Sequence, residues 1–302
     1  MDGEQRPDGY LARLATRSAA VASALCVGID PDPAGLPRGF SADIRGIERF
    51  SRLIVDASAP VAAAMKPNLA FFEAFGSAGL AALERVRAAI PPEIPVVLDA
   101  KRGDIGSTAA RHASALFDAL GGDAVTLSPY LGAAAIAPLL ERADRFAYVL
   151  CRTSNPGADE LQALVVARDD AARRPAEPLA DRVARLVVGW GPGGTVGLVV
   201  GATAPAELAR IRSVAPGLAF LVPGVGVQGG SLEAALADGP ASLPPAGGRP
   251  GGGLLITVSR AIAGAATGPD GAPGKDPGEA IAEAARAWAA KVPVLFSAAA
   301  AR

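Results

Sequence analysis

The sequence is poor in the residues that most metal sites and many nucleophilic enzymes use. Its 302 residues include two cysteines, Cys26 and Cys151, and one histidine, His112. Both cysteines lie in short apolar runs typical of buried strands, so we expect buried, reduced thiols rather than a disulfide or a metal site. A single histidine leaves almost nothing from which to build a histidine-ligated metal centre or a Ser-His-Asp triad.

An excess of one charge and long apolar runs are also absent. Twenty-nine basic against 30 acidic side chains leave a formal net charge of −1, which gives no reason to expect a nucleic-acid partner. Mean hydropathy is +0.30, but no stretch of about 20 apolar residues is free of charge, so we expect no membrane partner. The N-terminal segment MDGEQRPDGYLARLATR lacks the apolar centre of a secretory signal, which predicts a cytoplasmic protein.

Lysine is scarce as well. Only four of the 29 basic residues are lysines, at positions 66, 101, 275 and 291. In a chain that otherwise uses arginine for positive charge, each lysine raises the question of why an arginine would not serve.

What the sequence does contain is a regular alternation of strand-like and helix-like segments. Eight mostly apolar runs predict strands at 24–30, 61–66, 95–101, 123–128, 146–151, 195–201, 218–224 and 254–259. Between them, apolar residues recur at the helical spacing of three to four residues in 44–59, 74–89, 107–120, 178–188, 206–214 and 231–237. This pattern predicts an α/β fold, a (β/α)8 TIM barrel, because barrel strands are buried on both faces. A doubly wound open sheet is the competing layout.

We expect the whole chain, 1–302, to form a single barrel domain. A helix over about 9–21 precedes the first strand, and two Gly/Pro-rich stretches, 238–253 and 268–278, are expected to be surface insertions. The segment from 153 to 178 is long for a connection between a strand and a helix. In a barrel, such connections lie over the active-site face and often act as lids.

Charged side chains gather where the predicted strands end. In PVVLDAKRGDIGST, strand alternation directs Asp99 and Lys101 to the same face, toward the barrel mouth, and Asp104 follows at the turn. Taken alone, this D-x-K-x-x-D pattern is equally consistent with an ion pair that closes a strand end. Other strands also end in polar groups, namely Asp30, Lys66 and the pair Thr153-Ser154. Charged groups that converge at several strand ends cost stability and are typical of a catalytic site.

The last two strands predict a phosphate site. The segment LVPGVGVQGG offers small residues, backbone N–H groups and the amide of Gln228, and Arg260 follows the eighth strand. Such groups cradle anions, and barrel enzymes commonly bind phosphate after strands seven and eight. A Gly-rich connection beside an exposed arginine is the plain alternative.

Together these motifs resemble a known family, orotidine 5′-phosphate decarboxylase, in its longer bacterial branch, type 2. The matches run from Asp30 to Arg260 in the family's order: CVGIDPD, KPNLAFFEAFG, VVLDAKRGDIGSTA, LSPYLG, RTSNPG, VPGVGVQGG and VSRAI. The resemblance implies decarboxylation of orotidine 5′-phosphate to UMP and carbon dioxide, the last step of de novo UMP synthesis, without metal or cofactor. It also implies a homodimer whose active sites are shared between subunits.

The resemblance implies a role for each matching residue. Lys101 is similar to the proton donor, Asp99 to its neighbour beside the departing carboxylate, and Lys66 completes the array of aspartates and lysines. Asp104 and Thr108 are similar to residues that reach into the partner subunit's site.

Substrate contacts follow from the same resemblance. Asp30, together with Lys66, matches residues that hold the ribose hydroxyls, and Ser154 matches a contact to the pyrimidine. The phosphate side corresponds to Pro223, Gln228, Gly229, Ser259 and Arg260. Ser259 stands where glycine is usual in the shorter branch, and its backbone N–H can still serve.

The residue types suit this chemistry. Loss of the carboxylate leaves a carbanion at C6 whose lone pair lies in the ring plane, so it cannot delocalise into the π system and needs a cation beside it. Lys101 can neutralise that charge and then deliver the proton.

Two alternatives come from other classes of protein. A magnesium-dependent sugar-phosphate aldolase or decarboxylase of a related barrel places a carboxylate at the end of the second strand, whereas Lys66 stands there in this chain, and a cation repels a metal ion. A non-catalytic phosphate-binding protein would keep the barrel and lose the chemistry.

Overall fold

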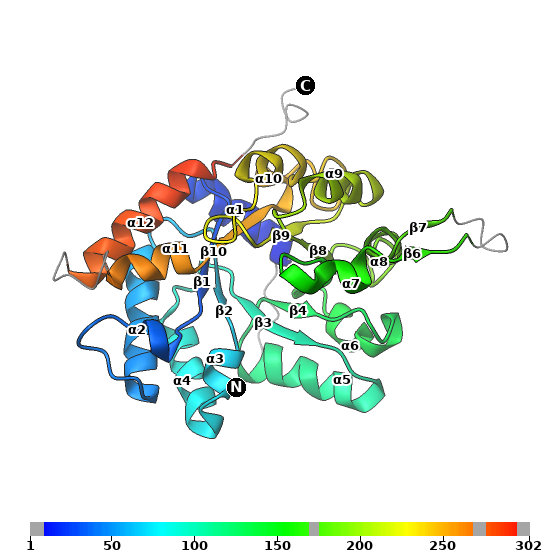
Figure 1. Cartoon of the computed structure of the whole chain (residues 1–302). Coiled ribbons are helices and arrows are strands. Elements are labelled where there is room, and N and C mark those ends of the chain that lie inside the picture. The colour runs from blue at the N-terminus through cyan, green and yellow to red at the C-terminus, as the bar shows by residue number, and fades with distance from the viewer. Residues whose placement is uncertain (1–8, 169–174, 268–275, 295–302) are drawn as a thin grey trace.

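The computed structural model describes residues 9–168, 175–267 and 276–294. Eight parallel strands form one sheet with the order β2-β1-β10-β9-β8-β5-β4-β3. Backbone bridges from Met65 to Val96 and from Asn68 to Asp99 join β2 to β3 and close the ring. Figure 1 shows the strands at the centre with helices around them. The predicted (β/α)8 barrel is therefore confirmed, and the competing open sheet is excluded because its two edges are joined.

All eight predicted strands are present. The barrel strands are β1 (Leu25–Ile29), β2 (Ala64–Pro67), β3 (Val97–Arg102), β4 (Ala124–Leu127), β5 (Phe146–Arg152), β8 (Val196–Val200), β9 (Phe220–Val222) and β10 (Leu255–Val258). A separate antiparallel pair, β6 (Val165–Val166) and β7 (Glu177–Pro178), lies in the long connection after β5. This pair forms an arm that projects from the barrel in Figure 1.

The helices lie between the strands. They are α1 (Tyr10–Val21), α2 (Ile44–Ser58), α3 (Ala70–Glu73), α4 (Gly76–Ala89), α5 (Gly106–Ala113), α6 (Ala137–Leu140), α7 (Asp159–Gln162), α8 (Leu179–Val187), α9 (Pro205–Val214), α10 (Leu232–Asp238), α11 (Arg260–Ala263) and α12 (Pro277–Lys291). Several begin at a side chain that accepts a backbone N–H, as Asp43 does for α2 and Ser231 for α10. The helix predicted over 107–120 is α5 continued by a π-helical turn, Ser114–Ala119.

Strand alternation divides the apolar side chains into two layers. Along β3, Val97 faces the barrel interior together with Cys26 and Tyr148, whereas Val96 and Leu98 pack in the layer between strands and helices. Both faces of the strands are therefore buried, which is why their sequences read as nearly continuous apolar runs.

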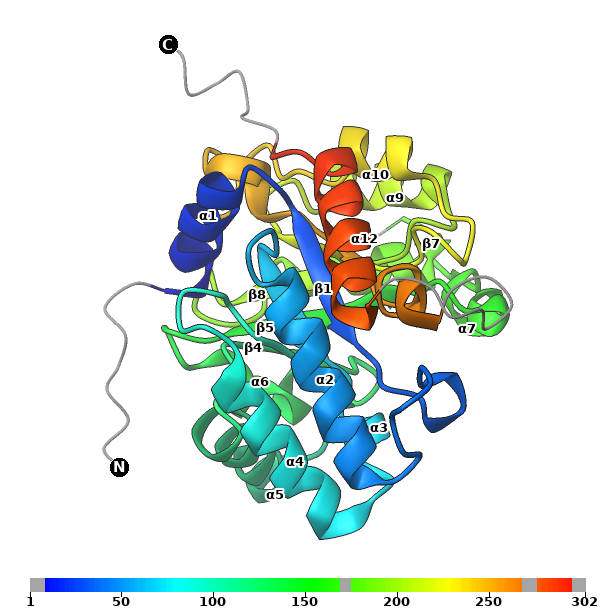
Figure 2. The same cartoon turned by 90° about the vertical axis from the view of Figure 1, so that its left-hand side faces the viewer.

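Helix α1 closes the amino end of the barrel. Tyr10 is 1% exposed and stacks on Phe146 with ring centroids 4.9 Å apart, and its hydroxyl lies 3.1 Å from that of Tyr148. Figure 2 shows α1 at the opposite end of β1 from the loop that follows this strand. This closure leaves the carboxyl ends of the strands as the open end of the barrel.

The stretch 238–253, predicted to be a surface insertion, is only partly at the surface. Residues 242–244 and 248–249 are exposed, but Ala241, Ala246 and the turn Pro250–Gly253 contribute buried residues that pack with α1 at the amino end. Small residues permit this close packing. Of the second stretch, residues 268–275 lie outside the described residues, and Asp276 caps the start of α12.

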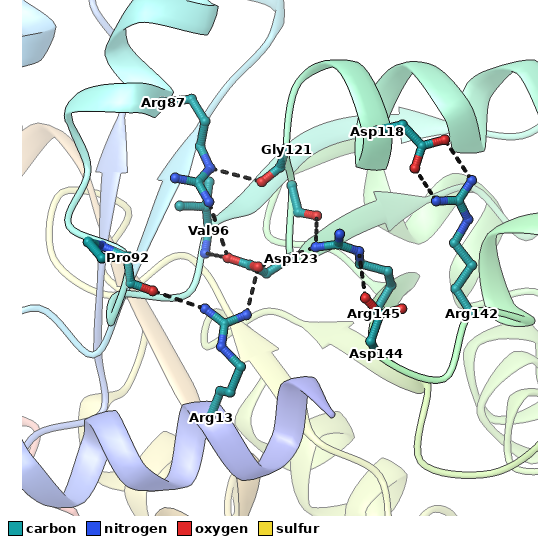
Figure 3. Close-up of polar contacts among 11 residues, drawn as sticks. Arg13, Arg87, Pro92, Val96, Asp118, Gly121, Asp123, Arg142, Asp144 and Arg145 are labelled. Carbon is teal, nitrogen blue, oxygen red and sulfur yellow. Dashed lines mark hydrogen bonds and ion pairs between the residues drawn. The ribbon is translucent and has the colours of Figure 1, made fainter. Parts of the chain in front are cut away.

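A buried carboxylate fixes the position of α1 (Figure 3). Asp123 has no exposed side-chain surface, and Arg13 of α1 donates to it at 2.7 Å. Arg145 and Arg87 also approach this carboxylate, at 3.5 and 3.7 Å, and the backbone N–H of Val96 donates to it at 2.9 Å. A buried charge is stable only when it is paired and hydrogen-bonded, and this one is.

Candidate active site

A cavity of about 500 Å³ opens at the carboxyl ends of the strands. Nine of the twelve residues predicted for the site line it: Asp30, Lys66, Asp99, Lys101, Ser154, Pro223, Gln228, Ser259 and Arg260. They come from segments spread over more than two thirds of the chain, and the closed barrel brings them together. Three of the lining side chains are cationic and two are carboxylates, so the cavity suits an anionic ligand.

Lys66, Asp99 and Lys101 form a continuous charged array. The Nζ of Lys66 lies 2.6 Å from Oδ2 of Asp99, and the Nζ of Lys101 lies 2.5 Å from Oδ1 of the same carboxylate. The side chains of Lys66 and Asp99 are 7% and 10% exposed, whereas that of Lys101 is 51% exposed. The array therefore runs from a buried ammonium group to one that faces the cavity.

The array shifts the pKa values of its members. Burial alone would raise the pKa of the Asp99 carboxyl, but the ammonium groups of Lys66 and Lys101 outweigh burial and hold this pKa well below its ordinary value. Burial alone would lower the pKa of Lys66, but the carboxylates of Asp99 and Asp30 outweigh it and raise this pKa above its ordinary value. Asp99 and Lys66 are therefore both charged at neutral pH.

Lys101 reaches the cavity through an irregular backbone. Its φ is +50°, in the left-handed region that costs a non-glycine residue about 1–3 kcal/mol. The register between β3 and β4 shifts between Leu98 and Arg102, on either side of this residue. Alternation along a regular strand correctly predicts the side on which Lys101 lies, but it does not predict this bulge. Strain of this kind persists only where the surroundings hold it, and it is common at functional sites.

Asp30 follows β1 and carries an unsatisfied oxygen. Its Oδ1 is buried and finds no hydrogen-bond partner among the described residues, although Asp30 lines the cavity. Buried carboxylate oxygens are normally hydrogen-bonded, so this atom is suited to accept a hydrogen bond from a ligand hydroxyl group.

A hydrogen bond joins the loops on two sides of the cavity. The hydroxyl of Ser154, after β5, donates to Oε1 of Gln228, after β9, at 3.0 Å. Glycine provides the space for Ser154, because a Cβ at Gly224 would lie 2.9 Å from the Ser154 Cβ, and Gly224 has a φ of +95°. Both polar side chains line the cavity and can turn toward a ligand.

Arg260 and Ser259 follow β10 at the cavity edge. Arg260 is exposed, and its side chain makes no hydrogen bond or ion pair with the residues that the structure describes. A Cβ at Gly28 would lie 1.8 Å from the Ser259 hydroxyl oxygen, so β1 and β10 approach closely only because residue 28 is glycine. The guanidinium group of Arg260 is available to an anion.

Three predicted site residues do not line the cavity of their own chain. Asp104 lies in the turn after β3, where its carboxylate accepts the backbone N–H of Ile105 at 2.7 Å. Thr108 is exposed on α5. Gly229 stands beside Gln228, and its N–H donates to the carbonyl of Gly226 within the same loop.

Several cavity residues were not predicted. Thr126 lies on β4 between Asp99 and the backbone of Lys101, and the alternation of DAVTLS could have identified it because it is a polar residue on an interior face. Asn68, two residues after Lys66, could have been identified by the same alternation, because it is also a polar residue. Gln162 binds Thr153 through both its carbonyl oxygen and its amide nitrogen, and no sequence pattern indicates this contact because it depends on how the long connection folds.

Two further properties concern possible ligands. Within the described ranges, no helix is both long enough and apolar enough to cross a lipid bilayer. Among the same residues, no group of three or more His, Cys, Asp or Glu side chains is placed to hold a metal ion.

Known proteins resemble this chain over most of its length. The family model described as "Orotidine 5′-phosphate decarboxylase / HUMPS family" matches residues 23–272. A protein named orotidine 5′-phosphate decarboxylase from Herpetosiphon aurantiacus is 49% identical over 241 residues, which cover 80% of this chain and 84% of that protein. One of the same name from Thermomicrobium roseum is 48% identical over 243 residues and covers 80% of this chain and 81% of its own length.

A solved structure shows the same architecture. The OMP decarboxylase of Leishmania donovani superimposes with a TM-score of 0.75 at 38% sequence identity, covering 94% of this chain and 97% of that one.

Proposed function

Because the chain belongs to the orotidine 5′-phosphate decarboxylase / HUMPS family, we propose that its Lys66–Asp99–Lys101 array carries out the family's reaction. The activity is the decarboxylation of orotidine 5′-phosphate to UMP and carbon dioxide in pyrimidine biosynthesis, and the protein is a carboxy-lyase. The observation that carries the residue assignment is the continuous ion pairing of two lysines through one aspartate in a cavity at the barrel mouth.

The reaction needs a cation at the carbon that loses the carboxylate. The bond between C6 of the pyrimidine and its carboxylate breaks, carbon dioxide leaves, and the electron pair stays on C6. In our proposal the ammonium group of Lys101 lies against this carbanion, stabilises it electrostatically, and transfers one proton to C6. UMP is then complete, and the neutral Lys101 amine regains its proton from solvent.

Asp99 and Lys66 hold Lys101 in place. Asp99 binds both ammonium groups. The buried Lys66 therefore holds the Asp99 carboxylate in position, and this carboxylate in turn holds the ammonium group of Lys101 at the cavity. Fixed charges that need no reorganisation during the reaction are the most effective form of electrostatic stabilisation.

The remaining cavity residues bind the substrate at a distance from C6. Arg260 and Gln228 are assigned to the phosphate, with Pro223, Ser259 and the loop around Gly229 beside them. Ser154 is assigned to the pyrimidine, and the unsatisfied oxygen of Asp30 to a ribose hydroxyl. Binding energy from the phosphate can then serve to order the loops around the ring.

We further infer a homodimer in which each subunit completes the other's site. Asp104 and Thr108 lie outside the cavity of their own chain, on the turn after β3 and on α5. Beside them are exposed apolar side chains, namely Ile105 at 70%, Tyr130 at 83% and Leu131 at 55% exposure. The backbone N–H of Asp104 donates to the carbonyl of Ala135, which joins the loops after β3 and β4. Exposed apolar groups of this size favour a protein interface.

A cytoplasmic location is part of the proposal. It is supported by Cys26 and Cys151, which are both free and buried, as expected of thiols in a reducing compartment.

The test is the fall in absorbance as the purified protein consumes orotidine 5′-phosphate, with and without a strong chelator. We expect turnover that the chelator does not change. Loss of turnover in the chelator would favour the magnesium-dependent relatives instead, and no turnover in either condition would favour a binding role.

A pair of lysine variants tests the residue assignment. Lys101→Ala should lower kcat by at least about 10⁴-fold, because carbanion stabilisation and proton transfer are both lost. Lys291→Ala, on α12 and outside the cavity, is the matched control and should keep normal turnover. Near-normal turnover of a folded Lys101→Ala protein would refute the assignment.

A further inference from the structure

Thr126 makes three hydrogen bonds with the catalytic segment of β3. Its hydroxyl donates to Oδ1 of Asp99 at 2.9 Å. The same oxygen accepts the backbone N–H groups of Ala100 and Lys101, each at 3.0 Å. Thr126 is 2% exposed and lies on β4, next to β3 in the sheet.

These contacts use the full bonding capacity of the hydroxyl group. A threonine hydroxyl has one proton and two lone pairs. Here the O–H donates a hydrogen bond to Asp99, and the two lone pairs accept hydrogen bonds from two backbone N–H groups. The oxygen is therefore oriented by all three bonds at once.

The two N–H groups lie in the irregular part of β3. The register with β4 shifts between Leu98 and Arg102, and Lys101 has a φ of +50° within this stretch. The hydroxyl oxygen of Thr126 thus accepts hydrogen bonds from backbone N–H groups at the place where the regular pairing of the two strands is interrupted. It holds the left-handed conformation from which the Lys101 side chain reaches the cavity.

We propose that Thr126 is a positioning residue that sets the relative geometry of Asp99 and Lys101. The inference rests on the proposed function of Lys101 as proton donor. Through one atom, Thr126 fixes the carboxylate that binds the ammonium group and also the backbone that carries it. The two carboxylate oxygens of Asp99 have different partners. Oδ2 accepts a hydrogen bond from Lys66, and Oδ1 accepts hydrogen bonds from both Lys101 and Thr126.

The positioning role predicts a specific kinetic pattern. Thr126→Val removes the hydroxyl and keeps a branched side chain of similar size, so Oδ1 of Asp99 loses a donor and two N–H groups lose their acceptor. A small displacement of Lys101 follows, and displacements of about 1 Å can lower the rate on the order of 10²-fold. We expect kcat to fall by about this factor with KM changed less than about threefold, because the phosphate contacts are untouched.

Two further variants separate positioning from folding. Thr126→Ser keeps the hydroxyl and should restore most of kcat. Thr195→Val is the matched control, because Thr195 is also 2% exposed and its hydroxyl finds no hydrogen-bond partner among the described residues. That control should retain kcat. Thermal unfolding and the dissociation constant for UMP are measured for each variant, and UMP should bind to Thr126→Val as it binds to the unmodified protein.

The outcomes decide the proposal. A folded Thr126→Val protein with normal kcat, or a Thr126→Ser protein as slow as Thr126→Val, would overturn it. If Thr126→Val does not fold, Thr126→Ala takes its place with the same expected kcat loss and the same refuting result. Failure of the unmodified protein to turn over orotidine 5′-phosphate would instead refute the proposed function, so the two failures are distinct.

Discussion

Two lysines share one carboxylate, and their exposure separates their roles. Lys66 is buried and bound to Asp99, whereas Lys101 is half exposed and faces the cavity. The buried ammonium group of Lys66 has a fixed partner and orients its neighbour, whereas the more exposed group of Lys101 is free to reach the reacting carbon. Lysine suits the reacting position because its ammonium group is compact and can release a proton, which a guanidinium group does not do.

The low pKa of Asp99 predicts how stability depends on pH. Because its pKa is lower in the folded protein than the ordinary value of about 3.9, the carboxylate contributes stability above about pH 4, and this contribution is lost as the pH falls. The free energy of unfolding of the unmodified protein should therefore exceed that of Asp99→Asn at pH 7 by more than it does at pH 3. Urea unfolding at several pH values measures this difference. A difference that does not change with pH would contradict the prediction.

Arg260 should act on the phosphate alone. Arg260→Ala should lower kcat/KM for orotidine 5′-phosphate by roughly 10- to 100-fold, the size expected for a charge-assisted hydrogen bond. Orotidine without the phosphate gives the comparison, because its kcat/KM should be nearly the same in both proteins. Steady-state kinetics with the two substrates decides the matter. If the Arg260→Ala substitution lowered kcat/KM equally for both substrates, Arg260 would not act through the phosphate.

At the scale of elements, the two ends of the barrel have different tasks. The carboxyl ends of the strands bear the cavity, while α1 and the turn Pro250–Gly253 pack together at the amino end. The Asp123 cluster of Figure 3 belongs to the amino end, since Asp123 immediately precedes β4. Changes at that end should act on stability rather than on catalysis.

Removal of the buried carboxylate tests this division. Asp123→Ala should lower the free energy of unfolding by about 3–5 kcal/mol, because Arg13, Arg87 and Arg145 lose their buried partner. Asp118, which pairs with Arg142 in the same region but is exposed, is the matched control, and Asp118→Ala should cost less than about 1 kcal/mol. Urea unfolding gives both values. We expect kcat of folded Asp123→Ala to be unchanged, and equal costs for the two variants would refute the argument.

At the scale of the whole molecule, the cavity of one chain is not lined by every residue assigned to the site, because Asp104 and Thr108 lie outside it. The turn with Asp104 and the start of α5 do not line the chain's own cavity, and exposed apolar side chains lie near them. A second copy can cover these side chains and bring Asp104 to the neighbouring cavity. A symmetric pair would exchange the same segment in both directions.

A subunit-mixing experiment tests the shared site. Lys101→Ala and Asp104→Ala should each be inactive alone, because each lacks one residue at both sites. Mixed and re-equilibrated, they should recover about a quarter of the unmodified activity, since half of the dimers are mixed and each has one complete site of two. Sedimentation analysis of the same samples checks that dimers form. No recovery in a mixture that contains mixed dimers would show that the sites are not shared.

The sequence by itself determined the barrel and most of the cavity. Apolar runs buried on both faces fix the strands locally, and period-two alternation correctly placed Asp99 with Val97 toward the interior. Charged residues immediately after strands must meet at one end of a parallel barrel, so Asp30, Lys66 and Arg260 could be assigned to the cavity from their positions alone. These features depend on a few adjacent residues, which is why a pattern reveals them.

Only the tertiary structure decided the contacts between distant segments. At the bulge, the backbone N–H of Lys101 donates to the Thr126 hydroxyl of the next strand, and Ser154 meets Gln228 although the two lie 74 positions apart in the sequence. The stretch 238–253 has the composition of a surface loop, yet part of it is buried because the amino end of the barrel needs a cover that small residues can form. Such contacts exist only after the ring closes, because closure sets which side chains face each other.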